Sequence, residues 1–141
     1  MPSATFTLFQ SFPEAALEKA HNLGSDSLVV ALTNSAPSAS TNTQLSDITQ
    51  ISYTNLSART LTTSSSSYSG ATYKLVLNDL TLTASGGSVA AFRHIVIYND
   101  TSVNDLLIGF LDYGSSLTLG DGDSLVLDFS ATNGVLQATI V

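Results

Sequence analysis

The residues Phe92-Arg93-His94-Ile95-Val96-Ile97-Tyr98 form a run, FRHIVIY, in which both alternating sets of side chains are largely apolar. A strand with one face in water alternates apolar and polar residues, so this run is typical of a strand covered on both faces. The stretch 27–33, SLVVALT, is also too uniformly apolar for a half-exposed strand. These two runs place a β-sheet at the centre of the expected fold.

Further strands are expected on both sides of these runs, separated by turn residues. Pairs such as Asn78-Asp79, Asn99-Asp100 and Asn133-Gly134 tolerate positive φ or cap their own turns. About eight short strands with one early helix predict an all-β fold, a jelly-roll-like antiparallel β-sandwich with one short N-terminal α-helix. The additional strands are expected at residues 4–9, 48–53, 72–78, 80–84, 106–113, 124–129 and 135–140.

The only strong helix-forming stretch follows the first of these strands. Ser11-Phe12-Pro13-Glu14 has the S-x-x-E spacing of a capping box, and residues 15–20, AALEKA, continue it. Gly24 is a natural residue for closing this helix. Apolar residues recur at spacings of three or four, so one stripe of the helix is expected to cover the sheet. The stripe consists of Phe9, Phe12, Ala16, Ala20 and Leu23.

Two polar segments are expected to be loops. Residues 34–55 are rich in Ser, Thr, Asn and Ala, and an excursion of this length is often functional or ordered by a partner. The run Ser64-Ser65-Ser66-Ser67 is expected to form a second, mobile loop.

Composition limits the class of protein. A chain of 141 residues is expected to form one domain, 1–141, and the absence of Cys excludes disulfides, thiol nucleophiles and Cys-ligated metals. The 11 acidic residues outnumber the 4 basic ones, giving a net charge of −7, and the basic residues are scattered, so nucleic-acid binding is not expected. No apolar run is long enough for a signal or membrane segment, so we expect a soluble protein made in the cytoplasm.

No catalytic or metal-binding constellation stands out. The two imidazoles, His21 and His94, are interpreted as a residue in the last turn of the helix and a neutral, hydrogen-bonded residue of the sheet. The segment 120–123, GDGD, is interpreted as a β-turn because it supplies too few oxygens for calcium. Nothing in the sequence places Asp112 opposite Asp128 as a glycosidase pair would require. We therefore expect no enzyme activity, no metal and no cofactor.

Several segments together resemble a known family. They are His21-Asn22-Leu23-Gly24 followed by 25–37, SDSLVVALTNSAP; 45–51, LSDITQI; 92–101, FRHIVIYNDT; and 111–116, LDYGSS, followed by Asp121-Gly122-Asp123. In this order they resemble a family of small proteins encoded among the virion genes of tailed bacteriophages and prophages. Residues 56–61, LSARTL, depart from the Gly-Tyr turn that the family usually carries there.

The resemblance implies a jelly-roll virion protein, a capsid decoration or cement protein on the outer face of an icosahedral head. It would bridge subunits of the major capsid protein, and three-fold association into a homotrimer is expected. The alternatives are a tail-tip, collar or fibre-associated protein, and a carbohydrate-binding module whose tyrosines contact host glycans. The partner contacts are expected in residues 1–10, 34–55 and 64–69. The candidate contact residues are Phe6, Phe9, Asn34, Pro37, Thr41, Asn42, Tyr53 and Tyr68.

Overall fold

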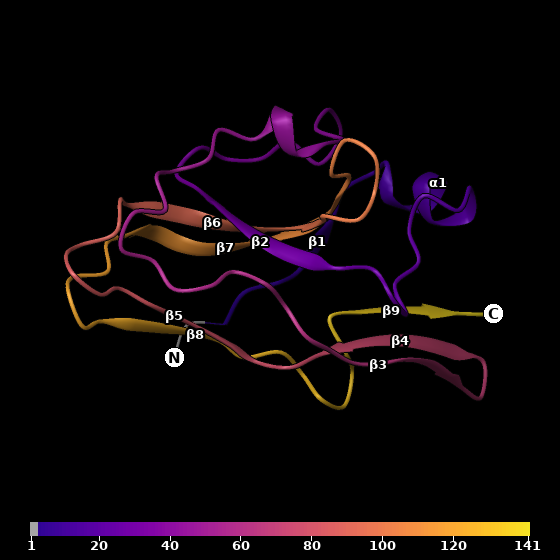
Figure 1. Cartoon of the computed structure of the whole chain (residues 1–141). Helices are drawn as coiled ribbons and strands as arrows, with labels where there is room; N and C mark the ends of the chain where they lie inside the picture. The colour runs from indigo at the N-terminus through magenta and orange to yellow at the C-terminus, as the bar shows by residue number, and fades with distance from the viewer. Residues whose placement is uncertain (1–2) are drawn as a thin grey trace.

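Antiparallel strands lie in two layers in the computed structural model, which describes residues 3–141 (Figure 1). One layer is a four-stranded sheet with the order β1 (Thr7–Leu8), β7 (Leu107–Leu117), β6 (Phe92–Asn99) and β2 (Leu28–Thr33). The other layer contains a three-stranded sheet, β3 (Thr63–Ser69), β4 (Thr72–Leu77) and β9 (Leu136–Thr139), and the pair β5 (Leu80–Thr83) and β8 (Ser124–Leu127). The expected all-β sandwich is confirmed, and the jelly-roll topology stays a prediction.

The strands β2 and β6 are buried on both faces, as their sequences predict. They pair in register, with Val30 opposite Ile97. Alternate side chains of both strands point into the space between the layers, where they join a core that includes Leu75 of β4 and Leu82 of β5. The intervening side chains, among them Val29 and Val96, point to the opposite face of the four-stranded sheet and form a second core.

The loop 34–55, rather than the helix, covers that second face. Ile48 is buried in the second core, and Leu45 packs against it. The helix α1 (Phe12–Leu17) lies at one end of the sandwich, where Phe12 contributes to the core between the layers (Figure 1). The helix therefore does not cover this face of the sheet as expected. Residues of the loop 34–55 cover it instead.

The helix is also shorter than the sequence predicts. Ser11 occupies the N-cap position in a helical conformation and makes no side-chain cap bond, so the expected capping box with Glu14 does not form. Lys19 takes a positive φ of 73°, which ends the helix at Leu17 instead of near Gly24. His21 consequently lies outside the helix.

The loop 34–55 is held by the chain itself. Its only regular element is a 3₁₀ helix, η1 (Leu45–Asp47), and the short strand expected at 48–53 is absent. The Asp47 carboxylate accepts hydrogen bonds from the backbone N–H groups of Thr43 (2.9 Å) and Gln44 (3.2 Å), and these bonds lower its pKa. The Leu107 N–H donates to the carbonyl of Thr43 at 3.0 Å, which fixes the loop to the start of β7.

The serine run is a strand and not a loop. β3 pairs antiparallel with β4, with Tyr68 opposite Tyr73 and Ser69 opposite Thr72. Gly70 supplies the positive φ (62°) that the tight turn between them requires. The partner strand, TYKLVL, buries Leu75 and Leu77, and pairing with it overrides the weak strand preference of serine.

Candidate docking surface

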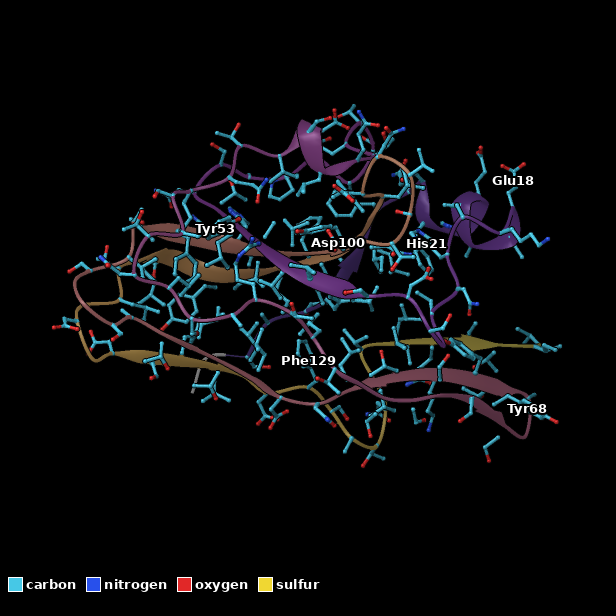
Figure 2. The ribbon with its side chains drawn as sticks, viewed as in Figure 1. Glu18, His21, Tyr53, Tyr68, Asp100 and Phe129 are labelled. Carbon is cyan, nitrogen blue, oxygen red and sulfur yellow. The ribbon has the colours of Figure 1, made fainter. Side chains whose placement is uncertain are left out.

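Three of the candidate contact residues are engaged within the chain. Phe9 is fully buried (0% exposed), so the structure does not support it as a partner contact. The half-buried Phe6 ring lies against Gly109, where a side chain would leave it no room. Tyr53 is half-buried between the loop and the edge of β2, and the Arg59 guanidinium stacks over its ring at 3.7 Å (Figure 2).

The remaining candidates lie in two separate places. Asn34 and Thr41 are exposed and Pro37 is half-buried, all in the loop that covers the second core. The Oδ1 atom of Asn42 accepts the Ser38 N–H at 2.7 Å, which makes it a brace of this loop. Tyr68 is 80% exposed near the tip of the β3–β4 hairpin, far from Tyr53 (Figure 2). Tyr53 and Tyr68 therefore do not lie on one shared surface for a glycan, whereas Tyr68 lies opposite Tyr73.

The chain's charge is distributed unevenly over the sandwich. None of the 11 acidic residues lies in 48–78 or 129–141, the segments that supply β3, β4 and β9. We call these three strands the acid-free sheet. Its only charged residue is Lys74, whose Nζ donates to the Thr132 carbonyl at 3.0 Å. No sequence motif marks this sheet. It carries no acidic side chain, although the net charge of the chain is −7.

The two faces of the acid-free sheet differ. Leu75 and Leu136 are buried on its inner face, against the core between the layers. The outer face carries short polar side chains in rows that cross all three strands, including Ser67–Lys74–Gln137. In the row Ser69–Thr72–Thr139, the Oγ1 atoms of the two threonines are 3.0 Å apart and share a hydrogen bond. This face can form hydrogen bonds and carries no negative charge.

A second surface feature is an apolar groove of about 570 Å³ between the layers. Phe6, Leu111 and Tyr113 line it from one layer, and residues 125–130 and 133–135 line it from the other. Among the described residues that line it, Asp128 is the only one with a carboxylate. The groove therefore offers apolar contact and no pair of groups for acid–base chemistry.

His21 belongs to a buried polar network rather than to a reactive site. The Nδ2 atom of Asn99 lies 3.0 Å from His21 Nδ1 and donates to Asp26 Oδ2 at 2.6 Å. The His21 ring stacks on Phe12, with 5.3 Å between the ring centroids. Burial lowers the pKa of His21, and the nearby Asp26 carboxylate offsets part of this effect. The neutral ring thus joins the N-terminal segment to the end of β6.

His94 is a sheet residue, as expected, but without the expected hydrogen bond. It is buried in β6, and its Nδ1 atom has no partner among the described residues. Its Nε2 atom lies 3.7 Å from Asp112 Oδ1, and burial lowers its pKa. Asp112 itself is held by Arg93 through two bonds of 2.8 and 3.0 Å, which lower the pKa of the carboxyl group.

The GDGD segment is a turn, as expected: the Asp123 N–H donates to the Gly120 carbonyl at 2.8 Å. Residues 3–141 contain no group of three or more side chains placed to hold a metal ion. Within the same residues, no helix has the length and apolar content to cross a membrane.

Comparison with family models, curated proteins and solved structures finds no match to this chain.

Proposed function

We propose that this chain is a structural protein of a tailed-phage virion that binds the outer surface of the head and bridges subunits of the major capsid protein. The resemblance of segments 21–37, 92–101 and 111–116 to virion proteins supports the proposal. The structural observation that carries it is the outer face of the acid-free sheet. This face is the part of a −7 chain that can approach another protein without presenting a carboxylate.

Docking through this face requires no active site. Ser67, Gln137 and Thr139 present hydroxyl and amide groups of the kind that form direct and water-mediated hydrogen bonds at wet interfaces. Each contact is weak, but many copies on a repeating capsid surface act together. The sandwich then adds buried interface between neighbouring subunits, which resists the outward pressure of packaged DNA.

The first test is the copy number of this protein per purified particle, measured by quantitative mass spectrometry against the major capsid protein. The proposal predicts a near-stoichiometric ratio. A handful of copies would contradict it and favour a place in the tail, while complete absence from the particle would remove the virion role.

A matched pair of variants tests the docking face. Gln137→Glu places a carboxylate on the exposed outer face of the acid-free sheet. Ser116→Glu adds the same charge to an exposed position of β7, in the other layer. When each variant is added to particles lacking this protein, Gln137→Glu should lower occupancy and Ser116→Glu should not. Equal occupancy would show that docking uses another surface.

A further inference from the structure

The acid-free sheet has two edges, and β3 forms one of them. The sheet order is β3-β4-β9, so β3 has a neighbour on one side only. No backbone hydrogen bond joins its other side to any segment within residues 3–141. Ser67, Tyr68 and Ser69 are exposed. β3 therefore has an unpaired row of N–H and C=O groups along this side, with Tyr68 exposed and Ser66 half-buried beside Gly24.

The direction of these groups follows from one backbone hydrogen bond and from the register of the strands. The Ile140 N–H donates to the Ala71 carbonyl at 2.9 Å, so Ala71 and, two residues on, Tyr73 direct their backbone groups toward β9. Thr72 and Lys74 then face β3, where their partners are Ser69 and Ser67. The alternate residues Ser66 and Tyr68 consequently direct their N–H and C=O groups away from the sheet.

Proteins protect such edges with charge, proline, or bulges, because an unprotected edge pairs with other strands. β3, TSSSSYS, contains no charged residue and no Pro, and its one irregularity lies at its start, between Thr63 and Ser65. Backbone bonds from residues 51 and 61 cover the edge strand β2, and Asp123 and Asp128 flank β8. β9, the opposite edge of the acid-free sheet, is also uncharged, but its four residues make it shorter than the seven-residue β3.

Charge also indicates what the edge binds. Two copies of a chain with net charge −7 repel each other wherever their acidic residues meet. The acid-free sheet is one region where two copies can meet without that repulsion, and unlike the carboxylate-free pair β5–β8 it is not flanked by Asp123 and Asp128. An antiparallel pair of identical strands has two-fold symmetry, which is the commonest symmetry of protein oligomers.

We propose that two copies of this chain associate by antiparallel pairing of their β3 edges about a two-fold axis at Ser67, joining two acid-free sheets into one. In this register Tyr68 of one copy lies opposite Ser66 of the other, and each of these residues directs its backbone groups across the axis. The arrangement forms about four backbone hydrogen bonds. The exposed Tyr68 ring is covered in the process.

The inference is independent of the virion role, and it replaces the three-fold association that the resemblance implies. Its test is sedimentation equilibrium of the purified full chain, which should give twice the chain mass of 14.7 kDa at micromolar concentrations. A mass of three chains, or a single chain at all concentrations, would overturn the two-fold pairing.

Charge variants at Ser67 test the axis itself. This side chain is exposed and lies on the outer face, and the proposal places it opposite its own copy. Ser67→Glu and Ser67→Lys should each weaken association by up to about fivefold, because like charges then face each other. An equimolar mixture of the two variants should recover it. Failure of the mixture to recover would show that Ser67 does not face itself.

Two controls separate folding and other partners from self-pairing. Ser116→Glu lies on β7 in the other layer and should leave the mass unchanged, and all variants should keep the wild-type circular dichroism. Hydrogen exchange at the Ser66 and Tyr68 amides should slow as the chain dimerises. If those amides become protected only when phage particles are added to a monomeric chain, the edge binds another protein and the proposal is refuted.

Discussion

Replacing Tyr53 with Phe should remove one of the hydrogen bonds that hold the loop 34–55 to the edge of β2 while leaving the aromatic ring in place. The Tyr53 hydroxyl accepts the Leu32 N–H at 3.0 Å and donates to Gln50 Oε1 at 2.6 Å. Leu32 is fully buried (0% exposed), so no water is expected to take the place of the lost acceptor. The Arg59 guanidinium can still stack on the phenylalanine ring.

The expected loss of stability follows from this burial. A buried backbone N–H left without an acceptor costs about 1–3 kcal/mol. Gln50 is exposed and can bond water instead, so its lost bond adds little. We therefore expect the free energy of unfolding to fall by about 2 kcal/mol. For a chain of this size that corresponds to a decrease in Tm of roughly 8 °C.

Denaturant unfolding followed by circular dichroism measures the change, and hydrogen exchange at the Leu32 amide locates it. Tyr68→Phe is the matched control, because its hydroxyl forms no hydrogen bond among residues 3–141 and its side chain is 80% exposed. A loss below about 0.5 kcal/mol for Tyr53→Phe, or one equal to the control, would refute the account of the loop as fixed by a buried hydrogen bond.

Three other measurements check the buried polar groups. Burial lowers the pKa of His21 and His94 below the usual 6.5, so near this pH the unfolded chain binds more protons than the folded chain. The free energy of unfolding should therefore fall as the pH drops below about 6.5. A flat stability profile down to pH 5 would contradict this. Burial raises the pKa of Tyr53 and Tyr98 above 10.0, so in an alkaline absorbance titration these two should ionise after the exposed tyrosines. For the same reason the free energy of unfolding should fall as the pH rises through 10.0. Asn99→Ala removes the acceptor of two backbone N–H groups and the donor to Asp26. Thermal unfolding should therefore show that the free energy of unfolding falls by about 3 kcal/mol. A loss below about 1 kcal/mol would mean that water replaces the side chain.

The apolar strands could be predicted from the sequence because their pattern is decided locally. FRHIVIY has no polar face, and it becomes β6, buried on both sides. The prediction of a loop for the serine run is wrong for the opposite reason: nothing local distinguishes TSSSSYS from a linker, and only pairing with β4 makes it a strand. The segment 48–53 has a strand-like pattern, but its backbone lies in a loop over the second core, where no strand is formed.

The candidate contact residues also divide into those whose exposure the sequence indicates and those whose burial it does not. Tyr68 and Thr41 are exposed as expected, since a polar surrounding sequence indicates solvent. Phe9 was expected to contact a partner because the sequence cannot show that the loop 34–55 returns to bury it. The acid-free sheet could have been found from the spacing of the 11 acidic residues alone, although its two free edges depend on strand order.

The pairing of β2 with β6 affects how the chain is made. Thr33 pairs with His94, so the ribosome adds about sixty further residues before the partner of β2 begins to appear. At elongation rates of about 5–20 residues per second this takes roughly 3–12 seconds, during which LVVALT, with no charge of its own, stays in water. Folding of the four-stranded sheet is therefore late and non-local, and β2 is the segment most exposed to aggregation during synthesis. Yield of folded protein should depend on translation rate and on chaperones that bind short apolar segments.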